Sequence, residues 1–92
     1  MIRSFRSKAL ERFFATGDGR RLSLPNTKRI ANILRALDEA SRLEDMNLPG
    51  FRFHSVGGRN RGRYAVDAIG NRRITFGWSE GDAIDVDLAD YH

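Results

Sequence analysis

The end of the chain concentrates side chains that can transfer protons. The last three residues, Asp90, Tyr91 and His92, place a carboxylate, a phenol and an imidazole next to one another after a predicted strand. Imidazole titrates at about pH 6.5 and exchanges protons under neutral conditions. The other histidine, His54, lies on the polar side of an earlier predicted strand, and two histidines without a helical i, i+4 spacing make a poor metal site. From position alone, a frayed tail and a structural histidine are the commoner interpretations.

A second group of residues is suited to binding phosphate. Between residues 57 and 63, Arg59, Arg61 and Arg63 stand at alternate positions in a glycine-rich loop. Glycines let the backbone approach a ligand closely, and guanidinium groups bind phosphate with paired hydrogen bonds. The loop is not a nucleotide-binding fingerprint, because the Walker lysine and the Ser or Thr after it are missing. The alternative is a flexible, charged connection between two strands.

Arg73 is the third candidate for chemistry. It lies in the middle of a predicted strand and points away from the apolar face of that strand. There it could stabilise the extra negative charge on a phosphate under attack, and Arg72 adds a second cation beside it. A surface arginine paired with a neighbouring aspartate explains the spacing equally well.

The distribution of charge supports binding of a polyanion. Of the 16 basic residues 14 are arginine, and the formal net charge is +4. The segment 51–78 holds six arginines and one aspartate, whereas the segment 80–90 holds five acids and no base. A dense basic patch is the usual electrostatic footprint of polyanion binding. Codon bias in a GC-rich genome could also explain the arginine count, and the acidic segment is compatible with a solvated strand face.

Length and composition narrow the class of protein. The 92 residues suffice for one compact domain, 1–92, without a deep cofactor cavity. The absence of cysteine excludes disulfides, thiolate zinc sites and a cysteine nucleophile. The charged start does not resemble a signal peptide, and no apolar run is long enough for a membrane helix. A soluble, cytoplasmic protein is therefore expected.

The elements that must position these residues follow an α+β order. Residues 1–5 are compatible with a short leading strand, and residues 8–15 carry apolar side chains at helical spacing. Two glycines at 17 and 19 end that helix. Pro25 predicts the start of a second helix, whose buried stripe is Ile30, Ile33, Leu34 and Leu37.

From residue 51 onward the apolar residues recur at every second position. Tight turns are predicted at 69–71 and at 79–82. The apolar faces are expected to be Phe51 and Phe53; Tyr64, Val66 and Ala68; Ile74, Phe76 and Trp78; and Ile84, Val86 and Leu88. The last three strands should form an antiparallel meander that packs one face on the helices, which leaves the other face, with Arg73, free for chemistry.

The chain resembles a HigB-type toxin of the RelE superfamily, the toxins of type II toxin–antitoxin systems also called plasmid maintenance killer proteins. The resemblance runs nearly end to end. It is carried by residues 1–5, Phe13-Phe14, residues 36–40, residues 44–54, the strand Asn71-Arg72-Arg73-Ile74-Thr75-Phe76 and the ending Asp90-Tyr91-His92. The last two motifs are the most specific.

The resemblance implies a RelE-like fold of two N-terminal helices packed on a small, mostly antiparallel twisted β-sheet. It implies cleavage of mRNA in the ribosomal A site without metal or cofactor. The implied partners are a HigA-like helix-turn-helix antitoxin, the ribosome and mRNA, with operator DNA bound only through the antitoxin complex and no membrane contact. Catalytic positions are expected at His54, Arg73, Asp90, Tyr91 and His92, and RNA-binding positions at Arg59, Arg61, Arg63 and Arg72.

In the mechanism expected from this resemblance, the 2′-hydroxyl of RNA attacks the adjacent phosphate. His92 would act as general base or acid, Asp90 would orient it, and Tyr91 would stack on a base or relay a proton. His54 would be the second proton-transfer group or a phosphate ligand, and Arg73 would neutralise the developing charge.

One departure from the family pattern leaves a second function open. The family usually reads His-Pro-Leu-Lys-Gly where residues 54–58 here are His-Ser-Val-Gly-Gly. Gly57 therefore replaces a lysine expected to contact RNA, and Arg59 or Arg61 could reach the same phosphate. The alternative is a catalytically weak homologue that acts mainly as an antitoxin-binding and operon-regulating module. A free-standing RNA-binding domain is less favoured, because the aromatic residues of the sheet are expected in the core.

Overall fold

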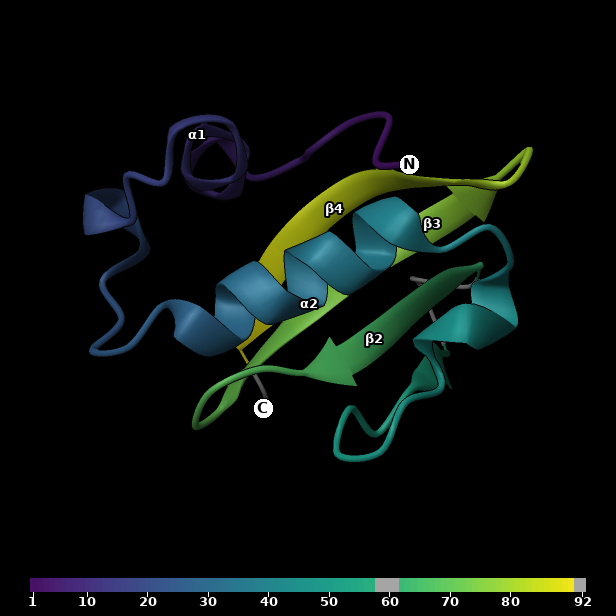
Figure 1. The fold of residues 1–92 in the computed structure, drawn as a ribbon. Helices are drawn as coiled ribbons and strands as arrows, with labels where there is room; N and C mark the ends of the chain where they lie inside the picture. Colours follow the sequence, from purple (N-terminus) through teal and green to yellow (C-terminus); the bar gives the residue numbers. More distant parts are fainter. Residues whose placement is uncertain (58–61, 91–92) are drawn as a thin grey trace.

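The computed structural model describes residues 1–57 and 62–90, in which helices precede a four-stranded sheet (Figure 1). The helical elements are α1 (Lys8–Thr16), the 3₁₀ turn η1 (Arg20–Leu22), α2 (Lys28–Glu39) and the 3₁₀ turn η2 (Leu43–Met46). The strands are β1 (His54–Val56), β2 (Arg63–Asp67), β3 (Arg72–Ser79) and β4 (Asp82–Asp90). They lie in the order β1-β2-β3-β4, and every neighbouring pair is antiparallel. The predicted α+β class is confirmed.

A side-chain cap begins α1, and a glycine in the left-handed conformation ends it. The Ser7 hydroxyl accepts a hydrogen bond from the backbone N–H of Leu10, which satisfies one of the free donors of the first turn. At the other end, Gly17 takes a left-handed conformation with φ of 79° and donates its N–H to Phe13 O. A residue with a side chain would be strained there. The helix therefore ends where the sequence predicted.

The second helix begins later than the sequence suggested. It starts at Lys28 rather than at Pro25, because the side-chain oxygen of Asn26 accepts the backbone N–H of Lys28 and holds the preceding residues in a turn. Its apolar stripe is buried as predicted and consists of Ile30, Ile33, Leu34 and Leu37. Within the described ranges, no helix is long and apolar enough to cross a membrane.

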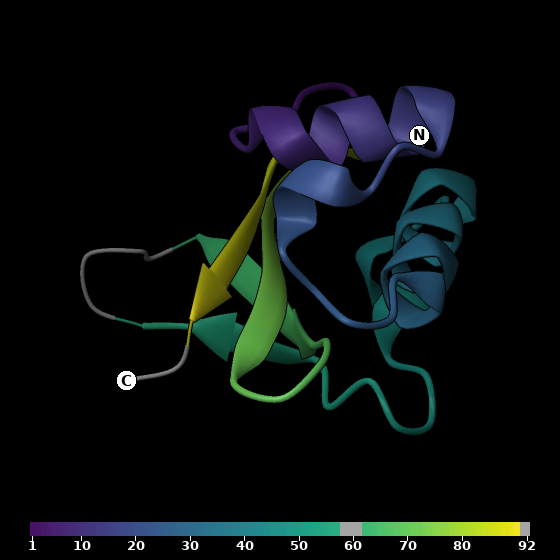
Figure 2. The same ribbon diagram turned by 90° about the vertical axis from the view of Figure 1, so that its left-hand side faces the viewer.

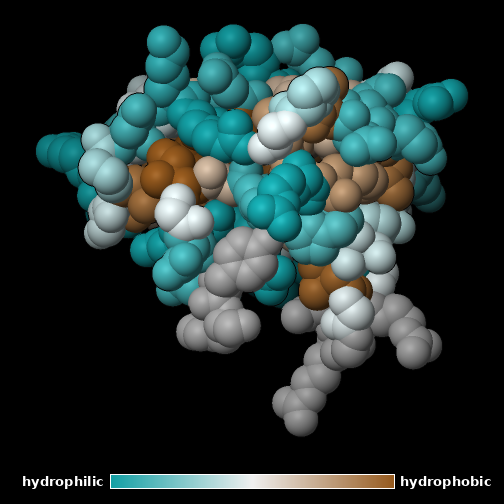
Figure 3. Space-filling view, turned by 90° about the horizontal axis from the view of Figure 1, so that it is seen from below, coloured by the Kyte–Doolittle hydropathy of each residue, from teal (hydrophilic) through white to brown (hydrophobic). Residues whose placement is uncertain are grey.

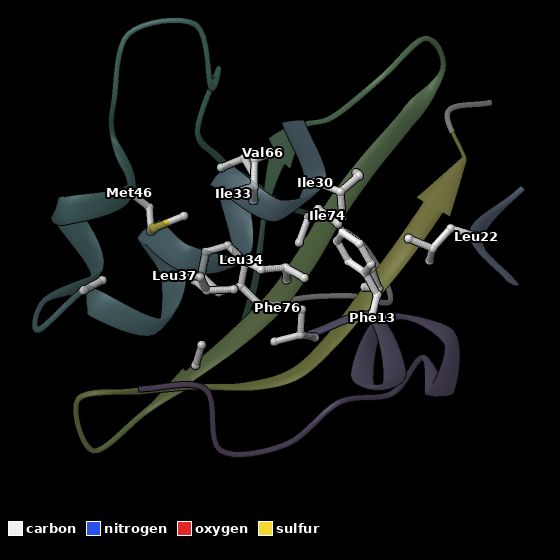
Figure 4. Packing of buried hydrophobic residues seen from close by; sticks show 14 residues of the cluster. Phe13, Leu22, Ile30, Ile33, Leu34, Leu37, Met46, Val66, Ile74 and Phe76 are labelled. Atoms are coloured by element: carbon white, nitrogen blue, oxygen red, sulfur yellow. The ribbon is translucent and has the colours of Figure 1, made fainter. Parts of the chain in front are cut away.

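The core lies between α2 and one face of the sheet (Figure 4). Its buried apolar residues are Leu10, Phe13, Leu22, Ile30, Ile33, Leu34, Leu37, Ala40, Met46, Val66, Ile74, Phe76, Ala83 and Val86. The rings of Phe53 and Tyr64 stack near Phe76 and close one side of this core. Trp78 is only partly buried at the margin of the core. Figure 2 shows α2 on one side of the strands, and none of the helices in the described residues covers the other side.

The predicted apolar face of β4 was wrong at Ile84, because the strand contains a β-bulge. Ala83 packs in the core in place of Ile84, whose side chain lies on the other face against Gly77. The ladder between β3 and β4 shifts between Thr75 and Gly77, so β4 has an extra residue there. Because side chains alternate at every second residue, one extra residue reverses the faces on one side of the bulge. Asp85 lies at the bulge with φ of 50°.

The predicted leading strand is reduced to two isolated bridges. Ile2 and Phe5 pair in parallel with Ala83 and Val86 of β4, so the start of the chain runs along the edge of the sheet. The Arg3 guanidinium donates to the Asp82 carboxylate at 2.9 Å and keeps the pKa of that carboxyl below its usual range. The bridges of Ile2 and Phe5 to β4 therefore place Arg6 beside that strand.

Arg29 ties α2 both to the end of β2 and to the segment that precedes β1. Its Nε donates to Ala68 O at 3.0 Å, and its Nη2 donates to Gly50 O at 2.7 Å and to Asp67 O at 2.9 Å. The guanidinium also lies over the Phe51 ring, 5.4 Å from its centroid. Arg29 is therefore a structural residue, and the start of β1 is held in a fixed position relative to the rest of the sheet.

Candidate active site

The face of the sheet that points away from α2 carries polar side chains in its centre. Thr75 of β3 lies opposite Ala65 of β2 and Asp87 of β4, and Arg73 lies opposite Ala89. Residues directly opposite each other in antiparallel strands project to the same face. We call this surface the open face. Figure 3 shows the molecule from below the view of Figure 1. On this side hydrophilic side chains predominate, and the apolar side chains form separate patches.

A cavity of about 100 Å³ lies on the open face. It is lined by Arg6, Val56, Arg63, Arg73, Thr75, Asp87 and Ala89. The lining contains three guanidinium groups, one carboxylate and one hydroxyl, contributed by three strands and the N-terminal segment. Such a cavity is suited to an anion with several oxygen acceptors, such as a phosphodiester.

Arg63 is held rigidly in this cavity. Its Nη2 donates to the Thr75 hydroxyl at 2.9 Å and to Asp85 O at 2.7 Å. Thr75 is itself 8% exposed. Burial lowers the pKa of Arg63, and repulsion from Arg6 lowers it further, while Asp85 and Asp87 act in the opposite direction. Arginine is effectively always protonated in proteins, so the group remains a fixed cation.

Arg73 lines the same cavity from the middle of β3, on the side of the strand that the sequence predicted. Its Nε is buried. The neighbours of Arg73 in the strand, Arg72 and Ile74, project to the other face by alternation. Two sequence-predicted residues, Arg63 and Arg73, are thus brought together in one site.

His54 lies on the open face but does not line the cavity. It begins β1 and pairs with Ala65, which in turn pairs with Thr75. Its Nδ1 lies 2.7 Å from Arg52 O. Because a carbonyl oxygen only accepts hydrogen bonds, Nδ1 is the donor of this contact. The contact fixes the orientation of the ring and leaves Nε2 as the ring nitrogen that it does not use.

Arg72 and Asp90 form an ion pair outside the cavity. Arg72 Nε lies 2.6 Å from Asp90 Oδ1, and the two residues are opposite each other in β3 and β4. Both are displaced by one residue from the pair Arg73 and Ala89, so their side chains project to the side that faces α2. The structure brings Arg72 and Asp90 together and separates both from the cavity that Arg73 lines. The predicted site residues Arg59, Arg61, Tyr91 and His92 lie outside the described residues.

Three polar residues that line the cavity were not predicted from the sequence as site residues. Thr75 had a usable signal, since it shares a strand face with Arg73. Asp87 was counted only as part of an acidic segment. Arg6 gave no sequence signal, because its position depends on pairing between opposite ends of the chain.

Gly57 occupies an open position directly after β1. It is exposed, and no atom lies within 4 Å of the place that a Cβ would take. Its neighbour Val56 lines the cavity. A longer side chain at this position would therefore fit without displacing any described part of the protein.

The sequence of the chain matches a family of toxins. Residues 3–92 match the family described as RelE-like toxin of type II toxin-antitoxin system HigB. The chain therefore belongs to the HigB-like toxin family. Over 92 residues it is 32% identical to the protein named Endoribonuclease HigB from Proteus vulgaris, and the match covers 100% of both chains.

Proposed function

We propose that this protein is a ribosome-dependent endoribonuclease that cuts mRNA and thereby inhibits translation. The arginine cavity on the open face carries the proposal, since it offers fixed positive charge to a phosphodiester. The relative named as an endoribonuclease matches over its full length, which supports the same chemistry here. As the toxin of a type II system, the protein would be cytoplasmic and neutralised by a HigA-like helix-turn-helix antitoxin, and it would reach operator DNA only within that complex.

The proposed reaction is an attack by the RNA 2′-hydroxyl on the adjacent phosphate. A bond forms between the 2′-oxygen and phosphorus, and the bond from phosphorus to the 5′-oxygen breaks. One proton leaves the 2′-hydroxyl for a base, and another is delivered to the departing 5′-oxygen. The products are a 2′,3′-cyclic phosphate and a 5′-hydroxyl, so the step requires no other reactant.

In this scheme Arg73 neutralises the charge that develops on the phosphate. The geometry of His54, with Nδ1 bonded to a carbonyl, supports proton transfer through its Nε2. His92 is proposed as the second proton-transfer group and Tyr91 as a residue that stacks on a base or relays a proton. His92 follows Asp90 by two residues, and an extended chain of that length spans about 7 Å. Asp90, which bonds Arg72, would anchor the tail from which His92 acts.

The RNA chain would extend from the cavity along the arginines of the hairpin between β1 and β2. Arg63 lines the cavity, and we propose that Arg59 and Arg61 continue the contact to successive phosphates. Arg72 projects to the other side of β3, and we propose that it contacts RNA at the end of that strand, beside its ion pair with Asp90. Phosphate contacts of this kind position a nucleic acid without reading its sequence.

The experiment that tests this function uses a defined mRNA bound to purified ribosomes. We expect the protein to cut the mRNA in the ribosomal complex, not to cut the same RNA free in solution, and to leave 2′,3′-cyclic phosphate and 5′-hydroxyl ends. Intact mRNA in all reactions, combined with tight binding to the cognate antitoxin, would reject the nuclease in favour of an antitoxin-binding and operon-regulating module.

A further inference from the structure

Arg6 reaches the open face because the N-terminal segment pairs with β4. Phe5 forms a parallel bridge with Val86, and the Arg6 backbone N–H donates to Val86 O at 2.8 Å. The exposed side chain of Arg6 lines the same cavity as Arg63 and Arg73. With strands about 4.8 Å apart, the backbone of Arg6 lies roughly 10 Å from β3, a separation that arginine side chains from both sides can share.

Repulsion between Arg6 and Arg63 raises the free energy of the folded protein when no anion is bound. Arg6 lies close enough to lower the pKa of Arg63 by repulsion. Arg63 cannot turn away easily, because Thr75 and Asp85 hold its Nη2 by hydrogen bonds. Two guanidinium groups that line the same cavity are stabilised when an anion lies between them.

Asp87 is the acid that lines this cavity among the described residues. Its Oδ1 accepts the backbone N–H of Leu88 at 2.9 Å, which fixes the carboxylate in place. Its charge favours the protonated form of Arg63. Among the residues that line the cavity, three guanidinium groups outnumber one carboxylate.

We propose that Arg6 and Arg63 form a second phosphate subsite beside Arg73, and that Asp87 serves as its counter-anion until RNA binds. The inference rests on the proposed function, since it assigns the neighbouring phosphate of the same RNA chain to this subsite. The subsite predicts an effect of Asp87 that the cleavage reaction alone does not require. Loss of the Asp87 charge should strengthen RNA binding and weaken the folded protein, because the phosphate no longer competes with a carboxylate and the arginines lose their counter-anion.

The test uses a fluorescein-labelled single-stranded RNA with 2′-O-methyl groups, which cannot be cut by 2′-hydroxyl attack. Binding is followed by fluorescence anisotropy at several salt concentrations. Arg6→Gln is expected to lower the affinity roughly tenfold and to reduce the slope of log affinity against log salt by about 0.7, the value for one lost phosphate contact on a single strand. Asp87→Asn is expected to raise the affinity and to lower the thermal midpoint of unfolding. Arg35 is an exposed arginine on α2, and Arg35→Gln is the matched control. It should change neither the RNA affinity nor the thermal midpoint.

The outcomes separate the subsite from the proposed function. If Arg6→Gln behaves like Arg35→Gln while Arg73→Ala weakens binding, the second subsite is rejected and the nuclease stands. If Asp87→Asn lowers both RNA affinity and the thermal midpoint, Asp87 is only structural and the counter-anion role is rejected. A wild-type protein without measurable RNA affinity rejects the subsite as well, whereas the proposed function is decided by the ribosomal cleavage assay.

Discussion

Replacement of Arg73 by alanine is expected to slow mRNA cleavage roughly 10²–10³-fold, the usual cost of removing one group that stabilises transition-state charge. The guanidinium lines the cavity on the open face, and its Nε is buried, so it acts where water screens charge weakly. Arg73→Lys should recover only part of the activity, because an ammonium group keeps the charge but cannot form the paired hydrogen bonds of a guanidinium.

The measurement is the single-turnover rate of cleavage of ribosome-bound mRNA, with circular dichroism to show that each variant is folded. Arg12→Ala is a suitable control, since Arg12 is exposed on α1 and, within the described residues, its ion pair is with Asp18. Unchanged cleavage by folded Arg73→Ala would remove Arg73 from the mechanism and leave the cavity without a catalytic role.

The second large effect is a gain of activity. Gly57→Lys is expected to raise mRNA cleavage about tenfold, the value of one charge-assisted hydrogen bond to phosphate. The HigB-type pattern that the chain resembles has a lysine at this position. Gly57 is exposed with open space around it, and its neighbour Val56 lines the cavity, so the new ammonium group can reach an RNA chain at little structural cost.

Gly57→Ala is the matched control, because it adds a Cβ without a charge. It should cleave like the wild type, and both variants should unfold at nearly the same temperature. If Gly57→Lys cleaves no faster than Gly57→Ala, another side chain already supplies the missing contact, as expected if Arg59 or Arg61 reaches the same phosphate.

Local patterns in the sequence predicted much of the fold. The stripe from Ile30 to Leu37 identified the buried face of α2, since helical periodicity depends only on neighbouring residues. The alternation around Arg73 placed that residue on the open face for the same reason. The predicted start of α2 at Pro25 was wrong, because the Asn26 side-chain oxygen accepts a hydrogen bond from the Lys28 N–H and holds the residues before the helix in a turn.

The features that sequence could not predict depend on contacts between distant residues. The bulge at Asp85 reverses the expected positions of Ala83 and Ile84, and alternation alone cannot reveal an inserted residue. The position of Arg6 in the cavity requires pairing of the N-terminal segment with β4. The ion pair of Asp90 with Arg72 likewise follows from strand register, which spacing within one strand does not determine.

RNA is expected to bind on the open face of the sheet. Nuclear magnetic resonance of the isotopically labelled protein, titrated with the 2′-O-methyl RNA, tests it most directly. We expect the largest shifts at the cavity residues Arg63, Arg73, Thr75 and Asp87, while the exposed side of α2 stays unchanged. Shifts confined to α1 and α2, with the cavity resonances unmoved, would contradict it.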